Sequence, residues 1–199
     1  HPQEWNSTID YENKKVAFIG SGATAVTLVP QIAKKASHVT MIQRSPTYIA
    51  SVPSKYKILH LLNYISPKFG YKIIRFTNIL RQRRIYRRAR RSPELVKDYL
   101  LGLVRDELPG FDIEKHFTPS YNPWEQRLCL APDSDFFESI NQKKVSIETE
   151  TIDSFSEKGV QLDSGKLIEA DIIVTATGIK LQNFGGIRIF VDENEIDIS

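Results

Sequence analysis

The residues best suited to chemistry form a run of small side chains, Gly20-Ser21-Gly22-Ala23-Thr24-Ala25. This run has the pattern G-x-G-x-x-A, in which the first glycine permits a tight strand-to-helix turn and the second lets a pyrophosphate approach the backbone. The small third position, Ala25, lets the helix pack closely on the strand. Free N–H groups at the positive end of the helix then attract phosphate. The run predicts a dinucleotide-binding site, and its plainer interpretation is a tight turn alone.

The elements that must position this run are a strand before it and a helix after it. Residues 15–19 are almost entirely apolar, which is typical of a parallel strand buried on both faces. Residues 23–36 have helical spacing, although Pro30 should remove a hydrogen bond and kink the helix. Residues 38–43 are β-branched and alternate, so they predict a second strand. Together these segments form a βαβ unit, the context that strengthens the glycine pattern.

The residues after the second strand indicate which dinucleotide is bound. An NAD site needs Asp or Glu about 20 residues after the first glycine, whereas an NADP site needs a cation there. Gln43 and Arg44 occupy this place, and no carboxylate is close in sequence. The planar guanidinium of Arg44 can bind a 2′-phosphate, and Ser45 can donate a hydroxyl. The sequence favours NADP, and the alternative is an exposed arginine in the turn before Pro46.

Composition excludes several other classes of protein. The 199 residues are 41% hydrophobic and 26% charged, which excludes a disordered or fibrous chain. A single cysteine, Cys129, excludes an internal disulfide framework and suits a reducing compartment, so we expect a cytoplasmic location. The four histidines have no metal-ligand spacing, and we expect no metal site. No apolar run approaches the roughly 20 residues that span a bilayer. The chain begins with His1 rather than Met, so we expect a piece of a longer protein.

An arginine-rich segment, Arg81–Arg91, contains seven arginines and no acidic residue. Such a run is typical of a nucleic-acid or anionic-membrane patch. We favour a solvated helix face with Ile85 and Tyr86 turned inward and the arginine stems lying on apolar surface. We therefore expect no nucleic-acid partner, while peripheral contact with a membrane stays open.

The fold class follows from the order of the elements. Helical spacing runs over 92–108, with Ser92 as N-cap and Pro93 in the first turn, and more weakly over 58–65 and 71–91. Strands are expected over 144–147, 152–155, 160–162 and 170–176, with turns near Gly159 and at 163–165. We predict an α/β, Rossmann-like dinucleotide-binding domain with a β-meander. It is discontinuous, formed by 1–47 and 122–199, with a helical insertion at 48–121.

Four short segments of the chain resemble motifs of class B flavoprotein monooxygenases, which include the Baeyer–Villiger and flavin-containing monooxygenases. His1–Trp5 resembles the end of that family's F-x-G-x-x-x-H-x-x-x-W fingerprint, although Asn6 replaces the usual proline. The tryptophan favours the Baeyer–Villiger side. The glycine run resembles the nicotinamide-binding motif, and Gln43-Arg44-Ser45-Pro46 resembles a Q-R-[ST]-P motif whose arginine meets the 2′-phosphate. Ala176-Thr177-Gly178 resembles a late A-T-G motif beside the junction of the two nucleotide domains.

This resemblance implies an FAD-dependent monooxygenase that uses NADPH to insert one oxygen atom of O₂ into a ketone or soft heteroatom, on a lipophilic small molecule. The family's FAD-binding glycine motif is not in this chain. We therefore expect the missing FAD domain to belong to the same polypeptide, and the isolated piece to be inactive. The resemblance would also give a catalytic role to Arg127, near the family's Lys-Arg pair, with Gln126 replacing the lysine. The alternative for Arg127 is a buried arginine paired with Asp133 or Asp135.

Two other functions remain open. The first is an NADPH-dependent flavoprotein reductase with two dinucleotide-binding domains, which shares the βαβ unit. Within this chain the lone Cys129 counts against its disulfide-reductase form. The second is a module without enzymatic activity that binds anionic partners through Arg81–Arg91.

Overall fold

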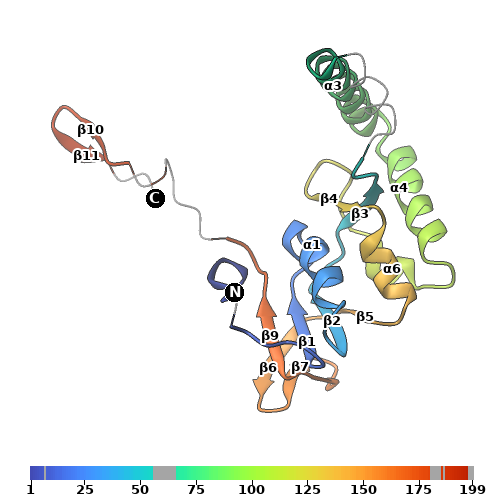
Figure 1. Ribbon diagram of the computed structural model, residues 1–199, viewed down its shortest axis with the longest axis vertical. Coiled ribbons are helices and arrows are strands. Elements are labelled where there is room, and N and C mark those ends of the chain that lie inside the picture. Colours follow the sequence, from blue (N-terminus) through green and yellow to red (C-terminus); the bar gives the residue numbers. More distant parts are fainter. Residues whose placement is uncertain (7, 56–65, 180–184, 186, 197–199) are drawn as a thin grey trace.

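A four-stranded parallel sheet organises the chain (Figure 1). The computed structural model describes residues 1–6, 8–55, 66–179, 185 and 187–196. The strand order is β5-β2-β1-β9, and the strands are β1 (Lys15–Ile19), β2 (His38–Gln43), β5 (Val145–Thr149) and β9 (Ile172–Thr175). All three neighbouring pairs are parallel. The predicted Rossmann-like α/β class is therefore confirmed.

The central strands are apolar because both of their faces are buried. Val16 and Phe18 on β1 belong to the main core, whereas Ala17 between them belongs to a smaller core on the opposite face. Met41 and Ile42 on β2 divide in the same way. Alternation along a strand sends neighbouring side chains to opposite faces, so a strand covered on both sides needs apolar residues throughout.

Helix α1 (Ala23–Ile32) covers one face of the sheet and starts directly after the glycine run. Its buried side consists of Ala25, Val26, Val29, Pro30 and Ile32. The helix ends two residues after Pro30, and the predicted continuation to residue 36 consists of turns. Pro30 lacks the N–H that would bond the carbonyl of Val26, so the last turn of α1 is short of one helical hydrogen bond.

A three-stranded antiparallel meander covers the other face of the sheet. Its strands are β6 (Ile152–Ser156), β7 (Gly159–Leu162) and β8 (Leu167–Glu169). The first two match the predicted strands, and β8 follows the predicted turn at 163–165 without having been predicted as a strand. Val160, Leu162 and Ile168 from the meander pack against Ala17 and Ile42 of the sheet. This second core leaves the carboxyl ends of the parallel strands free for a ligand.

A second, two-stranded parallel sheet was not predicted. It pairs β3 (Tyr48–Val52) with β4 (Leu128–Pro132), so a strand stands at the start of the segment expected to be a helical insertion. Between β3 and β4 the described residues form the helices α3 (Pro67–Arg91), α4 (Pro93–Glu107) and α5 (Ile113–Phe117). A short helix, α6 (Asp135–Asn141), follows β4. The expected helices at 71–91 and 92–108 are confirmed, and the one at 58–65 lies outside the described residues.

The orientation expected for Ile85 and Tyr86 is wrong. Both side chains on α3 are open to solvent, with 39% and 48% of their surfaces exposed. The buried residues of α3 are Gly70 and Ala89. The buried positions of α3 are thus small residues, and large side chains such as Phe69, Phe76 and Tyr86 remain exposed.

The two ends of the described chain form short elements. Residues Pro2–Glu4 make a single 3₁₀ turn, η1. Strands β10 (Ile189–Val191) and β11 (Asn194–Ile196) form an antiparallel hairpin that was not predicted. Within the described ranges, no helix is both long and apolar enough to cross a membrane.

Candidate dinucleotide-binding site

The glycine run lies at the carboxyl end of β1, where the chain turns into α1. Gly20 has φ of +127°, and its N–H donates a hydrogen bond of 2.9 Å to the carbonyl oxygen of Ile42. A Cβ on Gly20 would lie 2.5 Å from the carbonyl oxygen of Ala176. Glycine is required here both by the backbone conformation and by this close approach. The same approach brings the A-T-G segment against the glycine run.

The second glycine, Gly22, faces open space. It is the N-cap of α1, and no atom lies within 4 Å of the position that a Cβ would take. The first hydrogen bond of the helix runs from the N–H of Val26 to the carbonyl of Gly22. The N–H groups before Val26 have no partner inside the helix, and no side chain caps them. This helix end can therefore hold an anionic group such as phosphate.

The small residues that follow Gly22 have different environments. Ala23 and Thr24 are exposed beside the helix end, whereas Ala25 is fully buried against the sheet. Any larger side chain at position 25 would separate α1 from the sheet. The small residue at the third position of the pattern, Ala25, therefore allows the predicted close packing of α1 on the sheet.

Ser21 ties the glycine run to the loop after β2. Its side chain is only 7% exposed. The hydroxyl donates to the carbonyl oxygen of Ser45 at 3.5 Å and lies 3.4 Å from Oγ1 of Thr47. The loop that carries Arg44 and Ser45 therefore lies beside the glycine run. The hydroxyl of Ser21 is engaged within the protein, which leaves its backbone as the part that can contact a ligand.

Gln43 and Arg44, which both follow β2 in the predicted ribose position, have separate roles in the structure. Gln43 is 2% exposed, and its Nε2 donates to the carbonyl of His116 at 2.7 Å and to Oγ1 of Thr149 at 2.8 Å. Arg44 is exposed. Of these two side chains, the guanidinium of Arg44 is thus available to a ligand, whereas Gln43 anchors the loop through its buried hydrogen bonds.

An acidic residue also follows the neighbouring strand, β5, but its carboxylate is engaged elsewhere. The N–H of Glu150 donates to the carbonyl of Gln43, and the Glu150 carboxylate accepts hydrogen bonds from Ser164. These bonds lower the pKa of Glu150 below its ordinary value. Glu150 therefore belongs to the turn between β7 and β8 rather than to a ribose-binding position.

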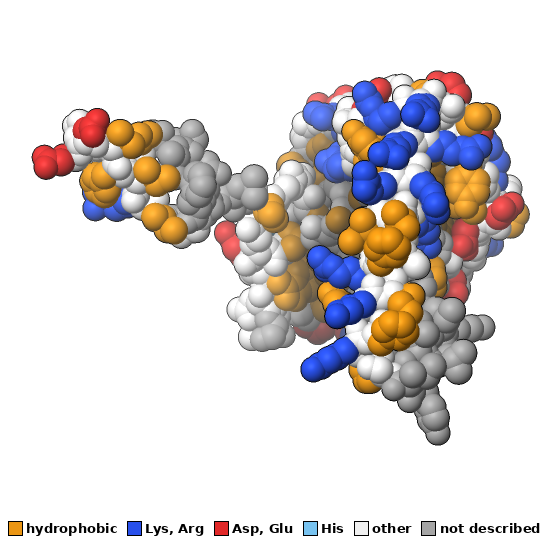
Figure 2. Space-filling view, turned by 90° about the horizontal axis from the view of Figure 1, so that it is seen from above, with side chains coloured by type: hydrophobic (Ala, Val, Ile, Leu, Met, Phe, Trp, Pro, Cys, Tyr) orange, Lys and Arg blue, Asp and Glu red, His pale blue; other side chains and the backbone are white. Residues whose placement is uncertain are grey.

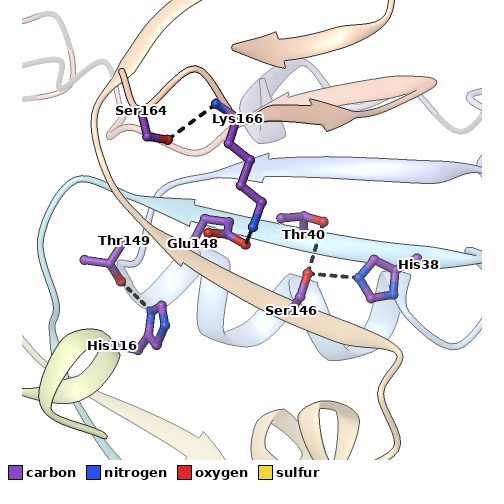
Figure 3. Close-up of polar contacts among 8 residues, drawn as sticks. All are labelled: His38, Thr40, His116, Ser146, Glu148, Thr149, Ser164 and Lys166. Carbon is purple, nitrogen blue, oxygen red and sulfur yellow. Dashed lines mark hydrogen bonds and ion pairs between the residues drawn. The ribbon is translucent and has the colours of Figure 1, made fainter. Parts of the chain in front are cut away.

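Polar side chains along β5 form local pairs (Figure 3). His116 Nδ1 lies 2.8 Å from Oγ1 of Thr149, and Lys166 forms an ion pair of 2.6 Å with Glu148. Farther along the strand, Ser146 connects His38 with Thr40. Lys166, Glu148 and His38 also line a cavity of about 370 Å³ between the parallel sheet and the β8 segment of the meander. No residue of the glycine run lines this cavity.

Protonation of His116 makes the stability of the folded chain dependent on pH. Burial, with a smaller contribution from Lys115, lowers the pKa of His116 below its ordinary value of about 6.5. As the pH falls below that value, the unfolded chain binds a proton that the folded ring resists, so the folded state loses stability down to the lower, folded pKa. We expect His116→Gln to lose less unfolding free energy than the wild type between about pH 7.5 and about pH 5. Denaturant unfolding at the two pH values measures this difference, and equal losses would contradict it.

The A-T-G segment joins two distant parts of the chain. The N–H of Ala176 donates to the carbonyl of Ile19 at 2.7 Å, directly before the glycine run. Gly178, with φ of +132°, accepts a hydrogen bond of 2.6 Å from His1 Nε2. The ring of Trp5 packs edge-on against Tyr11. The structure therefore brings together two segments of predicted site residues, 20–25 and 176–178, and places His1 of the fingerprint segment against the second of them.

Arg127 is exposed, so the alternative of a buried arginine paired with an acid is wrong. Asp133 accepts hydrogen bonds from Ser54, and Asp135 accepts one from Gln31. In the part of the chain that the structure describes, no carboxylate is within ion-pair distance of the Arg127 guanidinium. Arg127 directly precedes β4, whose Cys129 Sγ lies 3.9 Å from the carbonyl oxygen of Ser21. The arginine therefore leads into a strand that runs beside the glycine run.

The geometry defines a Rossmann-like α/β fold, and comparison with known proteins indicates which proteins it resembles. No protein-family model matches the chain. It is 49% identical to the probable FAD-binding monooxygenase AlmA of Acinetobacter baylyi, covering all of this chain and 40% of that protein. It is 47% identical to the FAD-containing monooxygenase EthA of Mycobacterium tuberculosis, covering all of this chain and 41% of that protein. The chain therefore spans about two fifths of the length of these curated relatives.

Solved structures with the same fold are flavin-dependent enzymes. A steroid monooxygenase bound to NADP superposes with a TM-score of 0.67 at 18% identity, over 87% of this chain and 40% of that one. Cyclohexanone monooxygenase superposes with a TM-score of 0.62 at 18% identity, over 87% of this chain and 42% of that one. At such identity these structures support the fold alone. The sequence relatives confirm the resemblance, because the chain is similar over its whole length to a segment of proteins named FAD-binding or FAD-containing monooxygenases.

Proposed function

We propose that the chain is the NADPH-binding segment of an FAD-dependent monooxygenase that inserts one oxygen atom of O₂ into a ketone or a soft heteroatom. The observation that carries this proposal is the uncapped first turn of α1, open above Gly22 and tied through Ser21 to the loop of Arg44. An uncapped helix end suits a pyrophosphate, and a cation on the adjacent loop suits a 2′-phosphate. The names of the sequence relatives support the monooxygenase part.

The residues present fit the nicotinamide dinucleotide. The backbone of Gly20–Ala25 would hold the pyrophosphate, and Arg44 with the hydroxyl of Ser45 would hold the 2′-phosphate. Ala176, Thr177 and Gly178 lie beside the first glycine and would border the nicotinamide half. When bound, NADPH supplies the hydride that reduces FAD, whose own site belongs mainly to parts of the polypeptide outside this chain.

The proposal gives Arg127 the catalytic role. Its guanidinium is exposed and not paired with any described carboxylate, so its charge is available to a ligand. A cation placed near a carbonyl under attack stabilises the negative charge that develops on its oxygen. Arg127 would serve that purpose in the assembled enzyme, together with the FAD-binding part.

We also propose what the assembled enzyme contacts and where it acts. The substrate is a lipophilic small molecule, and the main partner is the FAD-binding part of the same polypeptide. This chain alone binds NADP but is inactive, because it lacks the group that transfers electrons to O₂. The protein is cytoplasmic with contact at the periphery of a membrane, for which the basic helix α3 is the candidate surface.

Oxygen uptake by the full-length protein tests the proposed reaction. We expect NADPH oxidation coupled to O₂ consumption and to formation of an oxygenated product from a ketone or sulfide, with no such turnover by this chain alone. Titration calorimetry should give tighter binding of NADP⁺ than of NAD⁺. Equal affinity for the two, or none, would contradict the nicotinamide site. NADPH oxidation that passes electrons to an acceptor other than O₂ would favour the flavoprotein reductase instead.

A further inference from the structure

Helix α3 presents large apolar and cationic side chains together on one exposed face. Residues that recur every three or four positions share one side of a helix. In α3 every member of one such series is exposed to solvent. We call this series the outer face, and it consists of Phe69, Lys72, Phe76, Ile79, Arg83, Tyr86 and Arg90. In the view from above, cationic and apolar side chains alternate along the helix (Figure 2). Phe76 is apolar, yet 63% of its surface is exposed to solvent.

The charge of α3 is one-sided. Its 25 residues include two lysines and eight arginines but no acidic residue. The formal charge of the whole chain is +3, so the residues outside α3 carry a net charge of −7. None of the ten cations of α3 is within ion-pair distance of a described carboxylate. The helix is therefore a concentrated positive surface on a molecule that is otherwise acidic.

Two energetic costs coincide on this helix. Like charges three or four residues apart destabilise a helix, and α3 itself holds no acidic residue to relieve them. The four large apolar side chains of the outer face also remain in water, although burial would stabilise each of them. A partner that relieves both costs must be anionic and must accept apolar side chains. A bilayer with acidic lipids has both properties, since phosphates lie directly above an apolar layer.

Duplex DNA, whose bases are stacked on one another, relieves only the first of these costs. Its phosphates would pair with the arginines, and that contact depends on charge alone. Phe69, Phe76 and Ile79 would then still lie in water. The interleaving of apolar and basic side chains on one face therefore favours a lipid surface over duplex DNA.

We propose that the outer face of α3 binds the surface of a membrane that contains anionic lipids. The helix lies parallel to the bilayer, with Phe69, Phe76, Ile79 and Tyr86 in the boundary between headgroups and acyl chains. Lys72, Arg83, Arg90 and the neighbouring arginines contact lipid phosphates, because their long stems let the charges stay at the headgroup level. This proposal concerns the surface of α3 and does not rest on the proposed oxygenation reaction.

Vesicle flotation with the full-length protein tests this proposal. We expect binding to vesicles of phosphatidylcholine and phosphatidylglycerol, weakened by salt, and little binding to phosphatidylcholine alone. The double variant Arg83→Glu with Arg90→Glu should bind about tenfold or more weakly, since each basic residue near an anionic surface contributes substantially. A matched control, Lys34→Glu with Lys35→Glu, makes the same change in net charge at exposed positions after α1 and should bind as the wild type does.

A second variant tests the apolar part of the contact. Phe76→Ser with Ile79→Ser keeps every charge, and we expect it to lose the binding that persists at high salt. Circular dichroism and thermal unfolding should match the wild type, because both side chains are exposed. No binding of the wild type to anionic vesicles would overturn the proposal, as would an equal loss in the lysine control. Tighter binding to duplex DNA than to vesicles would overturn it in favour of a nucleic-acid partner.

Discussion

Alanine in place of Gly20 is expected to lower the free energy of unfolding by about 2–4 kcal/mol. The backbone at Gly20 has φ of +127°, which side chains other than glycine's rarely permit. The added Cβ would also lie 2.5 Å from the carbonyl oxygen of Ala176, on the neighbouring strand's extension. Backbone on both sides must then move, since a carbonyl cannot rotate away as a flexible side chain does. Denaturant unfolding of this chain, compared with the wild type, measures the loss.

Gly22→Ala is the matched control for that experiment. Position 22 has an ordinary φ of −79°, and no atom lies near the added Cβ. We therefore expect its unfolding free energy to change by less than about 1 kcal/mol. Its affinity for NADP⁺ should nevertheless fall, because the Cβ occupies the space through which a pyrophosphate approaches the backbone. Equal destabilisation by the two variants, or full NADP⁺ affinity in Gly22→Ala, would contradict the assignment of separate roles.

Arg44→Ala is expected to weaken NADP⁺ binding about 10- to 100-fold and to leave NAD⁺ binding unchanged. Hydrogen bonds to charged groups contribute about 1.5–3 kcal/mol each, and the 2′-phosphate exists only in NADP⁺. The fold should not change, because Arg44 is exposed and its neighbour Gln43 makes the buried contacts. Calorimetric titration of the full-length protein with both dinucleotides measures the ratio of affinities.

Two further variants separate charge from geometry at this position. Arg44→Lys keeps the charge but loses the planar fork, so we expect an intermediate preference for NADP⁺. Arg105→Ala removes an exposed arginine on α4, where it pairs with Glu114, and should leave both affinities unchanged. A preference for NADP⁺ that survived in Arg44→Ala would show that another residue binds the phosphate.

Local patterns predicted the elements around the glycine run because their determinants lie within a few residues. The apolar run of β1, the glycine turn and the β-branched run of β2 each follow from burial on both faces or from backbone freedom. Strand β4 lacked such a signal. Its buried residues Cys129 and Ala131 alternate with exposed Leu130 and Pro132, but all four are apolar or small, so no polar alternation marks the strand. Its pairing with β3 depends on a contact about 80 residues away in the chain.

The face of α3 that meets the protein could not be deduced from its sequence either. Large apolar residues occur around the whole helix, and the expectation was that Ile85 and Tyr86 would be buried. The buried residues of α3 are instead Gly70 and Ala89, two small residues that its hydrophobic pattern does not distinguish. Which side chains remain outside is therefore a tertiary property.

The sequence by itself determined the local features of the candidate site: a turn that only small residues permit, and an arginine shortly after the second strand. Only the tertiary structure decided which distant groups surround that turn. The strand order β5-β2-β1-β9 places Ala176 against Gly20, and His1 then reaches Gly178. Parallel strands bring their carboxyl ends to one edge of a sheet, yet which strands are neighbours depends on packing across the whole chain.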